Sequence, residues 1–531
     1  MGGGTGPRYF HVQQAVLTVG ASHGTSVNSP IVKAGDGTLV LTSGLNVLVN
    51  APLIINAGSV RATAGSTLPT GELRFRGGVL EIAGGGTFSR TIGFGANNLT
   101  WSGIDGNGVT NIPEERGSGG FAAVGSDVTV DLNAGGADNL VWEQLGFVDS
   151  DFALILGSRN ATAKVTFLDN INLTQTPVGA PPPALNYHAR EIRVIDNPGS
   201  ANDSATIGGN ISGALQDDLL KTGDGLLELT AVNTMQGMLL LNAGTLKLTG
   251  SVSASILTDV QNNATLAGTG TATQVVLESG GRLAPGSGGI GTLNATSLSW
   301  RSGGSGYFDL GAAGTADRIA LGSGALVKGR TSGPFTFNFN GTGFTGQVHT
   351  LATYGSTNFT AADFTATNLA PGVTGVFQVS GSTLLFTTQP IEIWRQSYFG
   401  VGVTNTGNAA DGFDADKDGL NNLGEYVLNT SSPLVSSTAL LPVTGQSGNA
   451  PTFTFTRNLS ASDVTLFIEA KFDLPAATWT TLATRPGTGP WTPGGGAAVV
   501  ENVGGVVTLT DSAVSIPSTV KRFYRLHVTR P

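Results

Sequence analysis

The chain contains no cysteine among its 531 residues. Disulfide bonds, thiol catalysis and cysteine-ligated zinc or iron–sulfur sites are therefore excluded. Charged residues are also scarce, at 12% of the chain, and the net charge of −9 comes with no basic run of the kind that binds a phosphate backbone. We therefore expect no nucleic-acid partner.

Long apolar runs are missing as well. No stretch reaches the roughly 18 apolar residues of a membrane-spanning helix, so no transmembrane segment is expected. Residues 1–7 lack the basic and apolar regions of a secretory signal peptide. We expect either that an export signal has been removed from this sequence or that the protein does not use that route. A cysteine-free chain that is poor in lysine and rich in threonine, asparagine and glycine is typical of exported bacterial surface proteins, which predicts an extracellular or cell-surface location.

What the chain does contain is a repeat. Residues 33–42 (Lys-Ala-Gly-Asp-Gly-Thr-Leu-Val-Leu-Thr) are nearly copied at residues 221–230 (Lys-Thr-Gly-Asp-Gly-Leu-Leu-Glu-Leu-Thr). Each copy is followed by Asn-Ala-Gly, at residues 56–58 and 242–244, and a third Asn-Ala-Gly occupies residues 133–135. A recurring strand-turn-strand unit indicates an architecture in which neighbouring units stack to bury a shared face.

The repeats have the period of β-strands. Leu39 and Leu41 alternate with outward residues, as do Leu227 and Leu229. The 79 glycines mark tight turns between such short strands. For the asparagines in the turns, hydrogen bonding to the next unit is favoured over a sugar-binding face.

These motifs resemble a known family. Lys-x-Gly-Asp-Gly-x-Leu-x-Leu-Thr, followed by Asn-Ala-Gly-Thr-Leu-Lys-Leu at residues 242–248, is similar to the autotransporter-associated β-strand repeat, also called the passenger-associated transport repeat. Residues 123–132, with residues 153–157, resemble the same repeat, and residues 281–286 look like the segment that follows such repeats. The resemblance implies a right-handed parallel β-helix that is exposed on, or shed from, a bacterial cell. We expect this solenoid over residues 30–388, preceded by an N-terminal cap or a donated strand at residues 1–29.

The most specific motif follows the solenoid. Residues 414–425 match the calcium-loop pattern D-x-[DN]-x-[DN]-G-x5-E at every specified position, with Gly419 at the sharp turn. Alternating carboxylates, one backbone carbonyl, one water-linked position and a final bidentate glutamate are the oxygen donors that Ca²⁺ prefers. The predicted metal-ligating residues are Asp414, Asp416, Asp418, Leu420 through its carbonyl, Asn422 and Glu425. The alternative is a solvated acidic turn that binds no metal.

The surroundings of the loop agree with this prediction. Residues 391–399 have the pattern of an amphipathic helix, and a second helix is expected to start near Leu423, which makes residues 389–436 a helix–calcium loop–helix joint. The segment resembles dockerin-type and thrombospondin-type-3 modules, which implies structural Ca²⁺.

Residues 437–531 alternate short strands with turn signals, which predicts a β-sandwich. This last part looks like the C-terminal module of large surface proteins of Verrucomicrobia-like bacteria.

Catalysis has weaker support. A polysaccharide-active enzyme needs carboxylates that converge on one groove. The pair Asp217–Asp218 is the nearest candidate, but adjacent residues of a strand point to opposite faces. The tryptophans Trp101, Trp142 and Trp300 are expected in the core instead of forming a glycan-stacking strip.

The sequence therefore predicts an all-β, non-catalytic structural protein: a cell-surface stalk, adhesin or matrix component whose partners are a surface glycan, the matrix or another copy of itself. The alternative is a subunit of an extracellular filament or sheath joined by β-augmentation. A β-helix enzyme is the third hypothesis.

Overall fold

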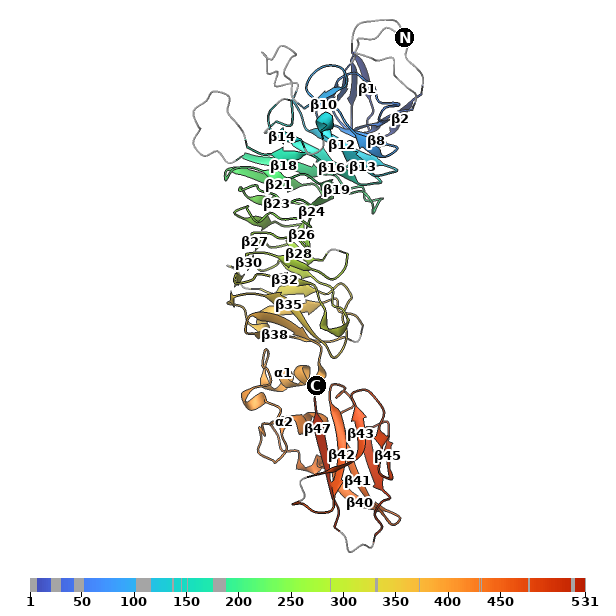
Figure 1. Ribbon diagram of the computed structural model, residues 1–531, viewed down its shortest axis with the longest axis vertical. Coiled ribbons are helices and arrows are strands. Elements are labelled where there is room, and N and C mark those ends of the chain that lie inside the picture. The colour runs from blue at the N-terminus through green and yellow to red at the C-terminus, as the bar shows by residue number, and fades with distance from the viewer. Residues whose placement is uncertain are drawn as a thin grey trace. The chain divides into compact units, whose positions relative to one another are not determined.

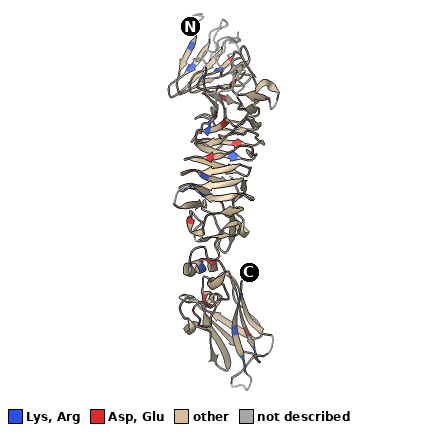
Figure 2. Cartoon of the chain, turned by 90° about the vertical axis from the view of Figure 1, so that its left-hand side faces the viewer, with Lys and Arg blue, Asp and Glu red and all other residues tan. Residues whose placement is uncertain are grey.

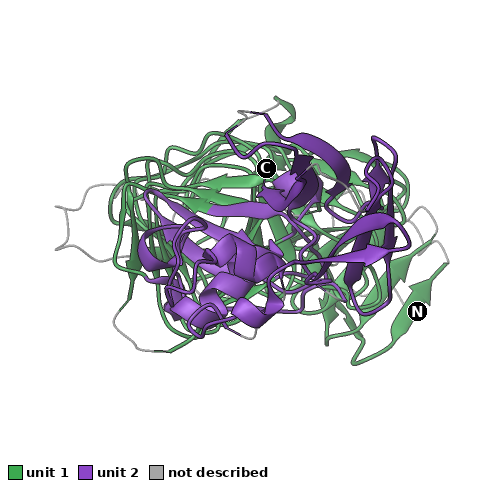
Figure 3. Cartoon of the chain, turned by 90° about the horizontal axis from the view of Figure 1, so that it is seen from below, with its two compact units in different colours: residues 1–308, 317–338, 352–359 green, residues 309–316, 339–351, 360–531 purple. Residues whose placement is uncertain are grey.

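The computed structural model describes residues 7–20, 30–42, 52–101, 116–135, 138–144, 146–149, 151–174, 188–286, 288–329, 333–371, 373–428, 430, 432–475, 478–516 and 521–530. The chain divides into two compact units (Figure 3). The first unit comprises residues 1–308, 317–338 and 352–359, and the second comprises residues 309–316, 339–351 and 360–531.

The first unit is a parallel β-helix, in which successive coils add one strand to each of several sheets (Figure 1). Among the described residues, its longest sheet has 14 strands, and neighbouring strands in it are parallel. In spatial order these are β2 (Val16–Val19), β4 (Thr38–Leu41), β6 (Ser59–Thr63), β8 (Val79–Ala83), β12 (Gly119–Val124), β15 (Ala153–Leu156), β18 (His188–Val194), β21 (Asp217–Thr222), β23 (Leu239–Leu241), β25 (Thr258–Val260), β27 (Gln274–Leu277), β30 (Ser297–Trp300), β33 (Ala325–Lys328) and β36 (Ser356–Thr357).

Two further parallel sheets run beside it. The N-terminal one consists of β1 (Arg8–His11), β3 (Ile31–Ala34), β5 (Leu53–Ile55), β7 (Leu73–Phe75), β11 (Asn98–Thr100) and β10 (Thr91–Ile92). The other consists, within the first unit, of β9 (Gly86–Phe88), β13 (Val128–Val130), β16 (Val165–Phe167), β19 (Ala205–Ile207), β22 (Leu226–Leu229), β24 (Gly244–Leu248), β26 (Ala264–Gly268), β28 (Arg282–Pro285), β31 (Ser305–Tyr307) and β34 (Phe335–Asn338).

Shorter ladders fill the remaining side of the coils. These are β14 (Asn139–Val141), β17 (Asn170–Asn172) and β20 (Ile211–Ser212), and then β29 (Thr292–Asn294), β32 (Arg318–Ala320) and β35 (Val348–Thr353). Two 3₁₀ turns, η2 (Leu132–Ala134) and η3 (Ala312–Gly314), lie between strands.

The expected solenoid fold is confirmed, and its cause is the alternation in the sequence. Leu227 and Leu229 of β22 are fully buried, and they lie in register with Leu246 and Leu248 of β24 on the next coil. Because the strands are parallel and in register, identical side chains stack along the sheet, and each coil buries the apolar face that its neighbour leaves open.

The two sequence copies form the same turn at two different corners of the solenoid. Residues 33–42 join β3 of the N-terminal sheet to β4 of the longest sheet, whereas residues 221–230 join β21 of the longest sheet to β22 of the third. The Asn-Ala-Gly turn lies one coil further on in both places. Gly244 requires its glycine, because φ is +66° and a Cβ there would lie 2.5 Å from the carbonyl oxygen of Gly223.

A buried lysine clamps each of these corners. Lys33 is fully buried, and its Nζ donates to the carbonyls of Gly35 (2.6 Å) and of Ala57 on the next coil (3.0 Å). Lys221 repeats this with Gly223 (2.6 Å) and Ala243 (2.9 Å). Burial lowers the pKa of Lys221 to about 8, against the opposing effect of Asp224. The lysine that begins each sequence copy thus places a buried ammonium group that links the backbone turns of two adjacent coils.

Aromatic residues fill the inside of the coils, as expected for the tryptophans. Trp101, Trp142 and Trp300 are at most 1% exposed. Trp101 contacts Phe147 edge-on at a centroid distance of 5.3 Å, and Trp300 contacts Phe337 at 5.1 Å.

One asparagine of the Asn-Ala-Gly turns bonds to a neighbouring coil: Asn133 accepts from the Ile92 N–H (2.9 Å). Asparagines at other turns do the same. The Asn170 side chain accepts from the Asn210 N–H (2.7 Å), and the Asn210 side chain accepts from the Thr234 N–H (3.0 Å).

The parallel pairing begins inside the range expected as a cap or donated strand, residues 1–29. Strand β1 pairs with β3, and β2 pairs with β4, so the described residues 7–20 belong to the first coil. Residues 1–6 and 21–29 lie outside the described part of the chain.

The second unit takes in η3 and most of β35, in residues 309–316 and 339–351. From residue 360 on it contains the short elements η4 (Ala361–Asp363) and β37 (Phe364–Thr367) and the antiparallel hairpin β38 (Val376–Ser380) and β39 (Thr383–Thr387). Two helices follow, α1 (Pro390–Phe399) and α2 (Asn422–Val427), with the turns η5 (Gly407–Ala409) and η6 (Thr438–Leu440). Pro390 at the first position fits the start of α1, and Gly400 with φ of +106° ends it.

The rest of the second unit is the expected β-sandwich. One antiparallel sheet has the order β40 (Val443–Ser447), β41 (Ala450–Thr456), β46 (Val506–Asp511) and β45 (Ala497–Glu501). The other has the order β44 (Thr492–Pro493), β43 (Thr480–Pro486), β42 (Thr465–Lys471) and β47 (Phe523–Thr529). The two inner faces meet in a core that contains Phe453, Ile468 and Leu509.

Replacing the clamp lysine should weaken the solenoid. We expect Lys221→Met to lower the free energy of unfolding by about 2–4 kcal/mol, because buried carbonyl groups lose their donor while the side-chain volume is kept. Urea unfolding followed by circular dichroism measures this. The matched control is Lys247→Met: Lys247 is partly exposed and pairs with Glu228 at 3.3 Å, so it should cost less than about 1 kcal/mol. Equal losses in the two variants would contradict the clamp.

Candidate metal centre

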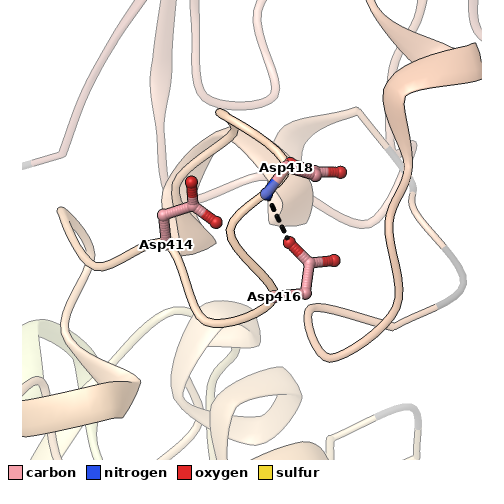
Figure 4. Close-up of side chains that lie close together, drawn as sticks. All are labelled: Asp414, Asp416 and Asp418. Atoms are coloured by element: carbon pink, nitrogen blue, oxygen red, sulfur yellow. Dashed lines mark hydrogen bonds between the residues drawn. The ribbon is translucent and has the colours of Figure 1, made fainter.

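Three aspartates converge in the turn before α2. One carboxylate oxygen from each of Asp414, Asp416 and Asp418 lies within 4.8 Å of the others (Figure 4). They are partly buried, and in the described part of the chain no other group of three or more acidic or histidine side chains comes as close together. The sequence-predicted first three ligands are therefore brought together.

Backbone hydrogen bonds hold the three carboxylates. The Asp418 N–H donates to Asp416 (3.2 Å), the Gly419 N–H donates to Asp414 (2.9 Å), and the Leu420 N–H donates to Asp418 (2.9 Å). Gly419 has φ of +92°, and this left-handed conformation turns the chain back at the sixth loop position, as the motif requires. The loop is thus preorganised by its own backbone, and one oxygen each of Asp414 and Asp416 is left without a hydrogen bond.

The remaining predicted ligands lie on α2. Asn421 caps this helix by accepting from the Gly424 N–H at 2.9 Å, which fixes the orientation of the residues that follow. Asn422 is 1% exposed, and its amide donates to the carbonyls of Asn408 and Ala410. Glu425 is fully buried but lies outside the close group of three aspartates.

Glu425 is the group of the site whose ionised form is most disfavoured. Burial raises its pKa to about 7, and the negative charges of Asp416, Asp418 and Asp414 push it in the same direction. Like charges in a buried site stabilise the protonated acid unless a cation is present.

The site passes a test of fit for a cation. Four side-chain oxygens in it are buried and accept no hydrogen bond: Asp414 Oδ1, Asp416 Oδ2, Asn422 Oδ1 and Glu425 Oε2. Buried polar atoms without partners are costly, and these four belong to the first, third, ninth and twelfth positions of the loop. An oxygen-rich set of this composition suits Ca²⁺. For Leu420, the structure gives the position of its N–H but no contact of its carbonyl.

Two partners of the site could not be read from the motif. Ser437 lies beyond α2, and its N–H donates to Asp418 Oδ2 (2.5 Å), which holds the pKa of that carboxyl below its ordinary value. Asp411, just before the loop, is not a ligand: it pairs with Arg395 of α1 (2.6 Å) and with Arg530 at the end of the chain (3.2 Å). Spacing alone gives no signal for either contact.

The other acidic pair has a different role. Asp217 accepts from the Ala214 N–H (3.0 Å), and Asp218 accepts from the Met238 N–H of the next coil (2.7 Å). Both side chains are buried. Burial raises the pKa of Asp218, and the negative charge of Asp217 raises it further. The Asp218 contact links two coils, whereas the Asp217 contact closes the turn that precedes β21.

No protein-family model matches the chain, and no curated protein matches it. In the described part of the chain, no helix is both long and apolar enough to span a membrane.

The raised pKa of Glu425 predicts an unusual pH dependence. Between 4.5 and about 7 the folded, metal-free state holds a proton that the unfolded chain has released, so stability should fall as pH rises through this window. The loss at pH 8 relative to pH 4.5 is about 3 kcal/mol. Chemical unfolding in EDTA at several pH values measures it. Glu425→Gln should flatten this slope; an unchanged slope in the variant would assign the titration to another group.

Proposed function

We propose that the chain is a non-catalytic structural protein of the bacterial cell surface or extracellular space, built on a β-solenoid. The observation that carries this is how the polar groups of the solenoid are used. Lys33, Lys221, Asp217 and Asp218 all bind backbone groups of their own or the adjacent coil. Such groups are committed to holding coils together, which leaves them poorly suited to substrate chemistry.

The distribution of charge along the chain is consistent with the same proposal. Figure 2 shows the few charged residues scattered along the coils, with both signs mixed. The likeness of the Lys-x-Gly-Asp-Gly and Asn-Ala-Gly turns to autotransporter-associated repeats remains part of the proposal, and the cell-surface location rests on composition.

Ca²⁺ is proposed as a structural ion of the second unit. The loop lies between α1 and α2, and both helices pack on the sandwich through a shared core of Ile391, Tyr426, Val464 and Leu466. Asp463, beside this core, accepts from the Ile391 N–H (2.9 Å) and from the Tyr426 hydroxyl (2.6 Å). An ion bound by Asp414, Asp416, Asp418 and Glu425 neutralises the charges at the centre of this assembly. Its chemistry is that of a hard cation held by oxygens, and no redox or Lewis-acid role is needed.

Calcium should therefore stabilise the second unit. We expect millimolar Ca²⁺ to raise its melting temperature by several degrees relative to EDTA, with weak binding of about 10⁻⁴ to 10⁻³ M, as in extracellular modules. Differential scanning calorimetry and titration calorimetry measure the two quantities. Asp416→Ala should abolish both effects, whereas Asp473→Ala, at an exposed aspartate of the same unit, should leave them intact. Melting that ignores Ca²⁺ in the unsubstituted protein would reject the site.

The structural proposal also predicts no turnover. Acidic and neutral polysaccharides incubated with the protein should release no new reducing or unsaturated ends. Cleavage that persists in purified protein and disappears in Asp217→Asn or Asp218→Asn would instead establish the enzyme hypothesis. Circular dichroism of both variants is the control, because these side chains also support the fold.

A further inference from the structure

A groove of about 560 Å³ runs beside the calcium loop in the second unit. One wall is formed by Leu420 of the loop, Leu423 of α2 and Leu428 directly after α2, and another by Leu441 and Pro442. The last wall is strand β47. A volume of this size falls within the range of about 300–1,000 Å³ that holds specific ligands.

The way in which β47 lines the groove identifies what the groove can hold. Five consecutive residues of this strand, 524–528, border it. Successive side chains of a strand point to opposite faces, so five in a row can border one groove only where it follows the edge of the strand. β47 is the last strand in its sheet order and pairs with β42 along its other edge. In the described residues, the groove therefore exposes a strand edge, with its backbone donors and acceptors, between apolar walls.

Both remaining walls depend on the calcium loop. Leu420 and Gly419 are loop residues, and Leu420 is the predicted carbonyl ligand. Leu441 follows Ser437, whose N–H is bound to Asp418 (2.5 Å) and whose hydroxyl lies 3.5 Å from Glu425. Binding of a cation by these carboxylates fixes the two walls relative to β47.

The same chain carries a strand that suits this groove. β2 is the last strand of the 14-stranded sheet and pairs, in the described residues, with β4 alone. Val16 is 59% exposed and Leu17 is 41% exposed. Because neighbouring residues of a strand face opposite ways, β2 presents apolar side chains on both faces, beside an edge to which no described strand pairs. A strand of this kind needs a partner, and its sequence Val-Leu-Thr-Val carries no charge.

We propose that β2 of a second copy of this chain adds to β47 in the groove, and that Ca²⁺ promotes this contact. The contact joins two different surfaces, so each copy keeps one free strand and one free groove, and copies continue into a chain or close into a ring. This rests on the proposed calcium site, and it gives the filament alternative a specific interface.

Light scattering of the full-length protein after size exclusion tests the proposal. We expect a mass that increases with protein concentration in millimolar Ca²⁺ and a monomer in EDTA. Leu17→Lys removes the donor strand and Leu441→Lys blocks the groove, so each variant alone should be monomeric in Ca²⁺. An equal mixture of the two should form a dimer and nothing larger, because only one productive pair of surfaces remains.

Matched controls and calorimetry make the result decisive. Leu440→Lys changes a 39% exposed leucine that does not line the groove, and Val232→Lys changes a 70% exposed valine of the solenoid; both should assemble like the unsubstituted protein. A monomer in Ca²⁺, assembly that is equal in EDTA, or assembly of Leu17→Lys alone would each overturn the proposal. Titration calorimetry of Leu441→Lys separates the two ideas: if Ca²⁺ still binds, failure of assembly leaves the calcium site standing.

Discussion

The hydrogen-bonded stacking of one coil on the next is the constraint on which the whole first unit depends. Parallel strands in register satisfy the backbone groups of the flat faces, but each corner leaves carbonyls that point inward and have no strand partner. Lys33 and Lys221 donate to such carbonyls through a buried ammonium group. The backbone N–H groups at other corners donate to the side chains of Asp169, Asp217 and Asn233. At these corners polar side chains bind the backbone, whereas the inward positions of strands such as β22 and β24 carry leucine.

The second unit has the opposite electrostatic character. Acidic side chains lie close together in and around the loop before α2, and they fall into two groups. Asp411 is neutralised by Arg395 and Arg530, whereas Asp414, Asp416 and Glu425 retain buried oxygens without partners. Because Arg530 is at the far end of the sandwich sequence, the loop and the sandwich depend on each other. This explains why a short acidic segment can organise two helices that are too short to be stable alone.

The sequence predicted the parts of the structure that arise from local chemistry. The alternation of Leu227 and Leu229 predicts a strand, and the D-x-D-x-D-G spacing brings three carboxylates together because the chain turns at Gly419. Long-range features could not be predicted. Equivalent turns at Lys33 and Lys221 join different pairs of sheets, because the turn encodes a bend and not the number of coils before it. Ser437 and Arg530 reach the acidic centre through the tertiary fold, and no spacing rule marks them.

The central claim is that an oxygen cage built on Asp414, Asp416, Asp418 and Glu425 binds Ca²⁺ and holds the second unit together. Anomalous diffraction from crystals grown with calcium tests it most directly. We expect one strong anomalous-difference peak in this loop, about 2.3–2.6 Å from oxygens of these side chains. An ordered loop in which the four carboxyl groups surround no peak would contradict it.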